Sequence, residues 1–126
     1  TPRYIGLQRP GAYADHLVVP HPKYLIDTSG VDPAWAATLS CSGLATYSAV
    51  AKLDPISPEE WVAVIGVGGL GLTAIAMLRA IGHERIIAVD IDTTKLKAAD
   101  VTATVDARSA DAAKEIQRIA GGPIYG

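Results

Sequence analysis

The chain has little of what several protein classes require. It holds one cysteine in 126 residues, which excludes an intramolecular disulfide framework and suits a reducing, cytoplasmic compartment. Its formal net charge is only −2, so no excess of positive charge predicts binding to nucleic acid or to an anionic membrane. No apolar run approaches the roughly 20 residues that a membrane span needs. The composition, 49% hydrophobic and 19% charged, is instead typical of one ordinary globular domain.

The first half of the chain mixes strand-like and helix-like segments. Residues 13–19 and 23–26 read as two short strands, which predicts a β-rich piece over residues 1–33. Asp32-Pro33 is typical of a helix start, since Asp caps a backbone N–H and proline needs none there. Two linking helices are then predicted within residues 34–60, with an interruption at Ser42-Gly43 and a proline-rich boundary at their end.

From residue 61 onward, apolar runs alternate with helical patterns. We predict two buried strands at 61–65 and 86–89, a weaker third strand at 103–105, and helices at 72–81, at 93–99 and from a cap at Ser109 to residue 120. The order β-α-β-α-β-α predicts an α/β fold with a parallel, doubly wound sheet, of which residues 61–126 form about half. A fourth strand would be expected where the chain stops, at Tyr125-Gly126, and Thr1 is not a methionine, so we expect a piece of a longer protein.

A glycine-rich turn lies between the first predicted strand and its helix. Residues 66–71 fit the pattern G-x-G-x-x-G, and Asp90 follows after the next strand. Gly66 allows the tight turn, Gly68 lets a pyrophosphate approach the backbone, and Gly71 lets the helix lie close to the sheet. The helix beginning near residue 69 has unpaired N–H groups that favour an anion. This context predicts a dinucleotide site.

The acid after the second strand predicts which dinucleotide binds. Asp90 would accept hydrogen bonds from the adenosine ribose hydroxyls, and its charge would repel a 2′-phosphate, so NAD is favoured over NADP. The alternatives are a tight glycine turn without a ligand and a solvated carboxylate at a strand end.

The residue types that bind metals are few and scattered. Cys41 alone cannot form a zinc site, which needs about three protein ligands, and a small buried apolar residue is the commoner role of a free cysteine. No metal-ligand spacing links it to His16, on a predicted strand, or to His21, in a loop. His83 follows a glycine in a turn, where we expect it to be exposed.

Four segments, taken in order, resemble the medium-chain, zinc-type alcohol dehydrogenases. The first matches that family's G-[GA]-[FY]-A-[ED]-x-x-x-V-P strand, the second its C-[AG]-G-x-T-x-Y-x-A-[LV] segment, and the others its nucleotide-binding strands and turns. The segments are residues 11–20, 41–50, 62–71 and 87–92 with Lys95. Four ordered matches over nearly the whole chain are far more specific than one glycine motif.

The resemblance implies a GroES-like catalytic domain joined to a Rossmann domain, in an enzyme that oxidises alcohols or reduces carbonyls with NAD. It implies that Cys41 is a catalytic zinc ligand in the whole enzyme, that Asp90 and Lys95 contact the adenosine ribose, and that Ile91 is an apolar wall of the adenine site. It also implies a small-molecule alcohol or carbonyl substrate and a homo-oligomer. The residues matched to the pyrophosphate and nicotinamide side of the cofactor are Val67, Gly68, Gly69 and Leu70.

One departure and two alternatives remain. Where the family has a threonine near the nicotinamide this chain has Ala45, with Thr46 one residue later, so we assign no catalytic residue. The other zinc ligands would lie before Thr1, so we expect no turnover from this chain alone. The alternatives are a zinc-free quinone or enoyl reductase of the same superfamily, and a non-catalytic dinucleotide-binding or assembly module.

Overall fold

The chain divides into two compact units in the computed structural model, which describes residues 3–122 and 124. The first unit is Thr1–Pro33 and the second is Ala34–Gly126. Tyr125-Gly126, where the sequence led us to expect a further strand, lies outside the described residues. No helix among the described residues is both long and apolar enough to cross a lipid bilayer.

The first unit has no β-strand in its described part, residues 3–33, so the strands predicted at 13–19 and 23–26 are wrong. Its only ladder pairing there is an isolated bridge between Ile5 and Arg9. An extended segment becomes a strand only when a neighbour takes up its N–H and C=O groups, and the described residues of this unit supply no such neighbour. The strand-like composition of these segments was therefore insufficient to make a sheet.

Local hydrogen bonds replace the second predicted strand. A 3₁₀ turn spans Pro22–Tyr24, and Nδ1 of His21 accepts the N–H of Lys23 at 3.1 Å. Proline suits this position because the first residue of a helical turn has no acceptor for an N–H. The predicted turn after residue 26 is confirmed: Oδ1 of Asp27 accepts the N–H of Ser29 at 2.9 Å.

Two short helices open the second unit. Helix α1 (Pro33–Thr38) begins at the proline, as predicted, and α2 (Leu44–Val50) ends in a 3₁₀ turn, Ala51–Leu53. Between them the chain does not break at Ser42-Gly43 but forms a π-helical turn, Leu39–Gly43. The hydroxyl of Ser42 donates to the carbonyl of Thr38, four residues earlier, a bond that often accompanies a bend in a helix.

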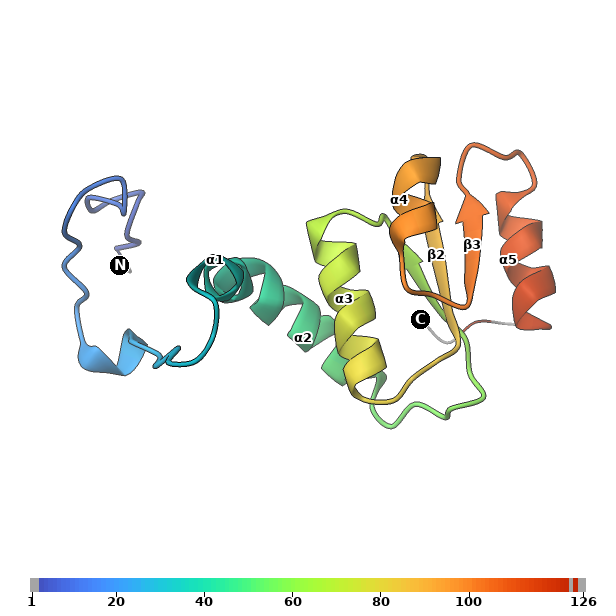
Figure 1. The fold of residues 1–126 in the computed structure, drawn as a ribbon, viewed down its shortest axis with the longest axis horizontal. Helices are drawn as coiled ribbons and strands as arrows, with labels where there is room; N and C mark the ends of the chain where they lie inside the picture. Colours follow the sequence, from blue (N-terminus) through green and yellow to red (C-terminus); the bar gives the residue numbers. More distant parts are fainter. Residues whose placement is uncertain (1–2, 123, 125–126) are drawn as a thin grey trace. The chain divides into compact units, whose positions relative to one another are not determined.

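A three-stranded parallel sheet with three helices forms the rest of the second unit (Figure 1), which confirms the predicted α/β fold. The strands lie in the order β1-β2-β3, and the register aligns Val64 with Ala88 and Ala88 with Thr104. The strands are β1 (Val62–Ile65), β2 (Ile86–Asp90) and β3 (Ala103–Asp106), and the helices are α3 (Gly69–Ala80), α4 (Thr93–Ala98) and α5 (Ala112–Ala120).

Strand β2 is the centre of the core. Alternate side chains point to opposite faces, so Ile86 packs with residues of α3 and α4, whereas Ile87 packs with residues of α5. The prediction that the first strand is buried on both faces is wrong, because Ile65 of β1 is 81% exposed. Strand β1 pairs only with β2 in the described chain and is therefore an edge strand.

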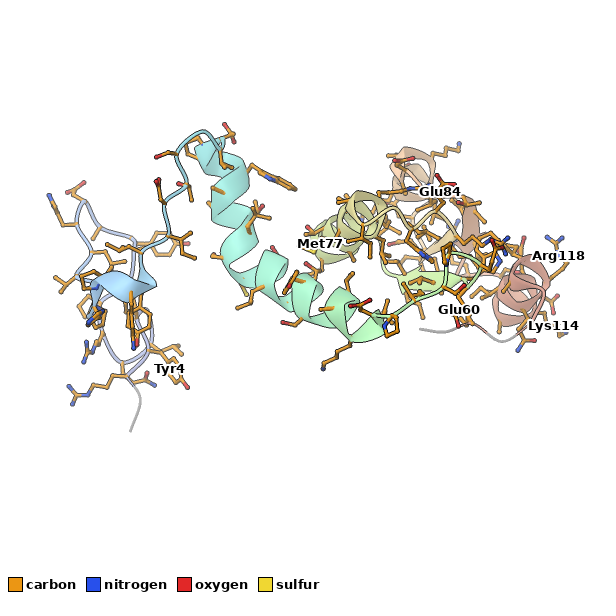
Figure 2. All side chains as sticks on the ribbon, turned by 90° about the horizontal axis from the view of Figure 1, so that it is seen from below. Tyr4, Glu60, Met77, Glu84, Lys114 and Arg118 are labelled. Carbon is orange, nitrogen blue, oxygen red and sulfur yellow. The ribbon has the colours of Figure 1, made fainter. Side chains whose placement is uncertain are left out.

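Helix α5 starts two residues later than predicted, because its N-cap is Asp111 and not Ser109. Ser109 lies in the preceding turn, where its hydroxyl accepts the N–H of Asp111 at 3.3 Å. The end is as predicted, since Gly121 has a φ of +70° that favours glycine. Figure 2 shows Lys114 and Arg118 projecting from α5 into solvent, which leaves its apolar residues for the sheet.

Arg85, which directly precedes β2, contacts the loop before β1. Its guanidinium donates to the carbonyl of Glu59 at 2.9 Å, pairs with the Glu59 carboxylate, and lies 5.8 Å from the ring centre of Trp61. We expect Arg85→Ala to lower the free energy of unfolding by about 1 kcal/mol, since the ion pair is exposed and adds little. Urea unfolding followed by tryptophan fluorescence measures this, and Glu59→Gln, which keeps the backbone carbonyl, should have a much smaller effect. Equal losses of unfolding free energy in both variants would contradict the expectation that the ion pair contributes little.

Candidate functional site

Two glycines fix the shape of the turn between β1 and α3. Gly66 has a φ of +90°, and its N–H donates to the carbonyl of Val89 at 2.7 Å. The first residue of the turn is therefore still hydrogen-bonded to β2. Gly71 has no space for a side chain, because a Cβ there would lie 1.9 Å from the carbonyl oxygen of Gly66. Both positions therefore require glycine for backbone reasons, as the sequence predicted.

The other two glycines of the turn face open space. A Cβ on Gly68 or Gly69 would meet no atom within 4 Å. Helix α3 begins at Gly69, and its first intrahelical bond runs from the N–H of Leu72 to the carbonyl of Gly68 at 2.9 Å. The amides of Gly69, Leu70 and Gly71 therefore have no intrahelical acceptor. An anion can approach the backbone here and meet the positive end of the helix dipole.

Asp90, the last residue of β2, is bonded to the glycine turn. Its Oδ2 accepts the N–H of Val67 at 2.6 Å, and its Oδ1 accepts the N–H of Asp92 at 2.8 Å. The hydrogen bond from Val67 lowers the pKa of Asp90 most, and the one from Asp92 lowers it next. The positive charge of Lys95 lowers the pKa further. The carboxylate is therefore ionised at neutral pH, at the carboxyl edge of the sheet.

The turn after β2 places the remaining predicted contacts beside Asp90. Oδ1 of Asp92 accepts the N–H groups of Thr94 at 2.9 Å and Lys95 at 3.4 Å, which starts α4. The ammonium of Lys95 lies 3.8 Å from Oδ2 of Asp92. Ile91 is 65% exposed and presents an apolar surface next to these charges. The structure thus gathers the glycine turn, Asp90, Ile91 and Lys95 at one edge of the sheet.

Sequence reasoning missed a second carboxylate at this edge. Asp106, the last residue of β3, is the register partner of Asp90. Its Oδ2 accepts a hydrogen bond from Nη2 of Arg108 at 2.6 Å, and its Oδ1 accepts one from Nε at 3.0 Å. These bonds lower the pKa of Asp106 to about 2. An acid at a strand end with an arginine two residues later was the available signal.

The Asp106–Arg108 pair predicts a measurable titration. The folded pKa lies below the ordinary value of 3.8, so the pair stabilises the fold above that pH and is lost as the pH falls towards about 2. We expect carbon NMR of the Asp106 carboxyl to show a midpoint near 2, returning towards 3.8 in Arg108→Ala. A midpoint near 3.8 in the unaltered chain would contradict the pairing.

Cys41 lies in the π-helical turn and is exposed. It therefore does not have the commoner role of a free cysteine, that of a small buried apolar residue. Within the described residues, no three side chains of histidine, cysteine, aspartate or glutamate gather in a way that could hold a metal ion. The described chain therefore offers one possible thiolate ligand and does not by itself fit a zinc centre.

His83 is buried, with 4% of its surface exposed, so the prediction that it is exposed is wrong. Its backbone N–H donates to the carbonyl of Leu78 at 2.9 Å, which turns the residue under the end of α3 instead of out into solvent. Its Nε2 has no hydrogen-bond partner among the described residues. Because His83 follows α3 at the end opposite the glycine turn, it takes no part in the candidate site.

An open cleft adjoins the glycine turn. On one side it is lined by Trp35, Thr38 and Ser42, and on the other by the first residues of α3, including Gly69 and Leu70. The π-helical turn that contains Cys41 therefore lies near the start of α3, across this cleft. Thr46 does not line it: that residue is buried, and its hydroxyl donates to the carbonyl of Ser42 at 2.7 Å.

The chain is similar to curated alcohol dehydrogenases, although it matches no family model. It is 40% identical to an NAD-dependent alcohol dehydrogenase of Sulfurisphaera tokodaii over 126 positions, which cover 97% of this chain and 36% of that protein. It is 36% identical to the NAD-dependent alcohol dehydrogenase of Saccharolobus solfataricus, over 94% of this chain and 35% of that protein. The chain thus spans about a third of the length of these relatives.

Solved structures show the same likeness. The alcohol dehydrogenase of the hyperthermophilic archaeon Aeropyrum pernix superimposes with a TM-score of 0.73 and 30% identity, over 94% of this chain and 36% of that one. An alcohol dehydrogenase of Thermotoga maritima gives a TM-score of 0.62 and 26% identity, over 78% of this chain and 28% of that one. Sequence and fold agree on the same group of proteins.

Proposed function

We infer that this chain, a homologue of the NAD-dependent alcohol dehydrogenases, is the part of such an enzyme that binds the adenosine diphosphate half of NAD. One observation supports this most: an open glycine turn at the start of α3 lies within hydrogen-bond distance of Asp90, an ionised carboxylate at the end of the next strand. A diphosphate and a ribose are linked to each other in NAD, and this site offers donors for one beside an acceptor for the other.

Each group has a separate task in the proposed complex. The amides of Gly69 and Leu70 donate to the diphosphate, and Gly68 lets it come close because no side chain intervenes. The carboxylate of Asp90 accepts the ribose hydroxyls, and the charge of Lys95 helps to lower the pKa of that carboxyl. Ile91 offers an apolar surface to the adenine. Val67 contributes less through its amide than the sequence suggested, because that N–H already donates to Asp90.

In the whole enzyme we propose that these residues hold the cofactor for hydride transfer between a small alcohol or carbonyl compound and NAD, whose nicotinamide supplies the hydride chemistry. The cleft beside Leu70 leaves room for the rest of the cofactor. The similarity to NAD-dependent alcohol dehydrogenases supports this proposal over the zinc-free reductase alternative.

Titration calorimetry of the chain with NADH, NADPH and ADP-ribose tests the proposal. We expect ADP-ribose to bind about as tightly as NADH, because the described site grips the shared adenosine diphosphate. NADPH should bind at least about tenfold more weakly, because its 2′-phosphate meets the charge of Asp90. Absence of binding by NADH and ADP-ribose alike would refute the proposed site.

Three expectations from the sequence stay predictions: zinc ligation by Cys41 in the whole enzyme, a homo-oligomeric state, and a cytoplasmic location. The assignment of residues 1–33 to a GroES-like catalytic domain is likewise a proposal. Zinc ligation by Cys41 would need further ligands, because the described residues do not complete a zinc site.

A further inference from the structure

The Asp90 carboxylate joins two turns that bound the proposed cofactor site. One oxygen accepts the N–H of Val67 in the glycine turn, and the other accepts the N–H of Asp92 in the turn before α4. We propose that Asp90 is a positioning residue for the diphosphate: it holds the glycine turn in its anion-receiving shape, besides facing the ribose. This inference rests on the proposed function and adds a second role for one of its residues.

The glycine turn needs such a restraint because glycine is the residue with the most backbone freedom to lose. The side chain of Val67 is fully buried among core residues, which fixes one point of the turn. The N–H of Gly66 donates to Val89, which fixes a second point through the backbone. Asp90 adds a third restraint, on the N–H of Val67, from a side chain on the neighbouring strand β2.

Charge alone would argue against an aspartate so close to an anion site. A carboxylate repels a diphosphate, so a purely electrostatic account makes loss of Asp90 favourable for phosphate binding. If Asp90 positions the turn, its loss should instead weaken phosphate binding, because the turn loses a charge-assisted hydrogen bond. Each carboxylate oxygen can accept two hydrogen bonds, so holding the two turns leaves acceptors for ribose hydroxyls. The two roles are therefore compatible in one residue.

Amide hydrogen exchange in the ligand-free chain tests the first half of the proposal. We expect the Val67 amide to be protected, and to exchange at least about tenfold faster in Asp90→Leu, which keeps a similar shape but has no acceptor. The Gly66 amide is the internal control, because its acceptor is the Val89 carbonyl and its protection should persist. An unprotected Val67 amide in the unaltered chain, or equal exchange in the variant, overturns the proposal.

Inorganic pyrophosphate, which has no ribose, tests the second half by calorimetry. We expect Asp90→Leu to weaken its binding about tenfold, and Asp90→Asn, which keeps one acceptor, to weaken it less. Asp106→Asn removes an equal charge from the neighbouring strand end, where the carboxylate bonds to Arg108, and should leave pyrophosphate binding unchanged or tighter. Circular dichroism verifies that each variant is folded.

The outcomes separate this inference from the function on which it rests. If the unaltered chain binds NADH and pyrophosphate but the Asp90 variants bind pyrophosphate as well as it does, Asp90 contacts the ribose alone and the inference is wrong. If the unaltered chain binds neither compound, the proposed function and the positioning role both fail, whatever the exchange of the Val67 amide.

Discussion

Gly71→Ala is expected to destabilise the second unit by about 3 kcal/mol, near the upper end of the usual cost of overpacking. The added Cβ would lie 1.9 Å from the carbonyl oxygen and 3.0 Å from the carbonyl carbon of Gly66. Both atoms are backbone, so they cannot move aside without shifting α3 or the end of β1. Urea unfolding followed by far-ultraviolet circular dichroism measures the difference.

Gly69→Ala is the matched control for that experiment. It introduces the same methyl group two residues earlier, at the first position of α3, where a Cβ would meet no atom within 4 Å. Alanine favours the helix over glycine by up to about 1 kcal/mol, so this variant should be as stable as the unaltered chain or more so. If both variants unfold at the same urea concentration, the close approach of α3 to the turn is not as described.

Gly68→Ala is expected to leave the fold intact and to weaken NADH binding roughly 100-fold, the equivalent of losing one or two charge-assisted hydrogen bonds. Gly68 has a φ of −86°, which alanine adopts without strain, and its Cβ would have open space around it. That open space is where the diphosphate would approach the amides of Gly69 and Leu70. The methyl group would therefore displace the ligand and no part of the protein.

Calorimetry with NADH, alongside a urea unfolding curve for the same sample, separates these two effects. We expect the unfolding free energy to change by less than about 0.5 kcal/mol, as for substitutions that touch nothing. Gly68→Ala binding NADH as tightly as the unaltered chain would mean that the diphosphate does not approach the backbone at that glycine. In this motif Gly68 therefore leaves space for the ligand, whereas Gly71 leaves space for the backbone of the turn.

The sequence predicted the second unit well because its signals are local. The continuous apolar run before Asp90 is long enough to identify a strand buried on both faces, and the structure buries β2 accordingly. The glycine spacing identified the β1–α3 turn, because two of its positions have local backbone requirements that only glycine meets. Short-range patterns of this kind are visible in a single sequence.

The features that the sequence did not predict depend on residues far apart or on missing neighbours. The bond between Val67 and Asp90 joins positions 23 residues apart, so no local pattern reveals it. Ile65 belongs to an apolar run yet is exposed, because exposure depends on what packs over that face of the sheet, and Ile65 lies in neither core cluster of the described chain. The strand-like residues 13–19 likewise could not show that the segment lacks a partner in the described part of its own unit. Pairing, unlike periodicity, is a property of the whole fold.

Amide proton and nitrogen NMR of the isotope-labelled chain during a titration with NADH shows directly whether the cofactor binds at the glycine turn. We expect saturable shifts concentrated at Gly68, Gly69, Leu70 and the residues following Asp90. The apolar groove between α2 and α3, lined by Tyr47 and Met77, should be unaffected. Shifts confined to that groove, or no shifts at all, would contradict a cofactor site at the carboxyl edge of the sheet.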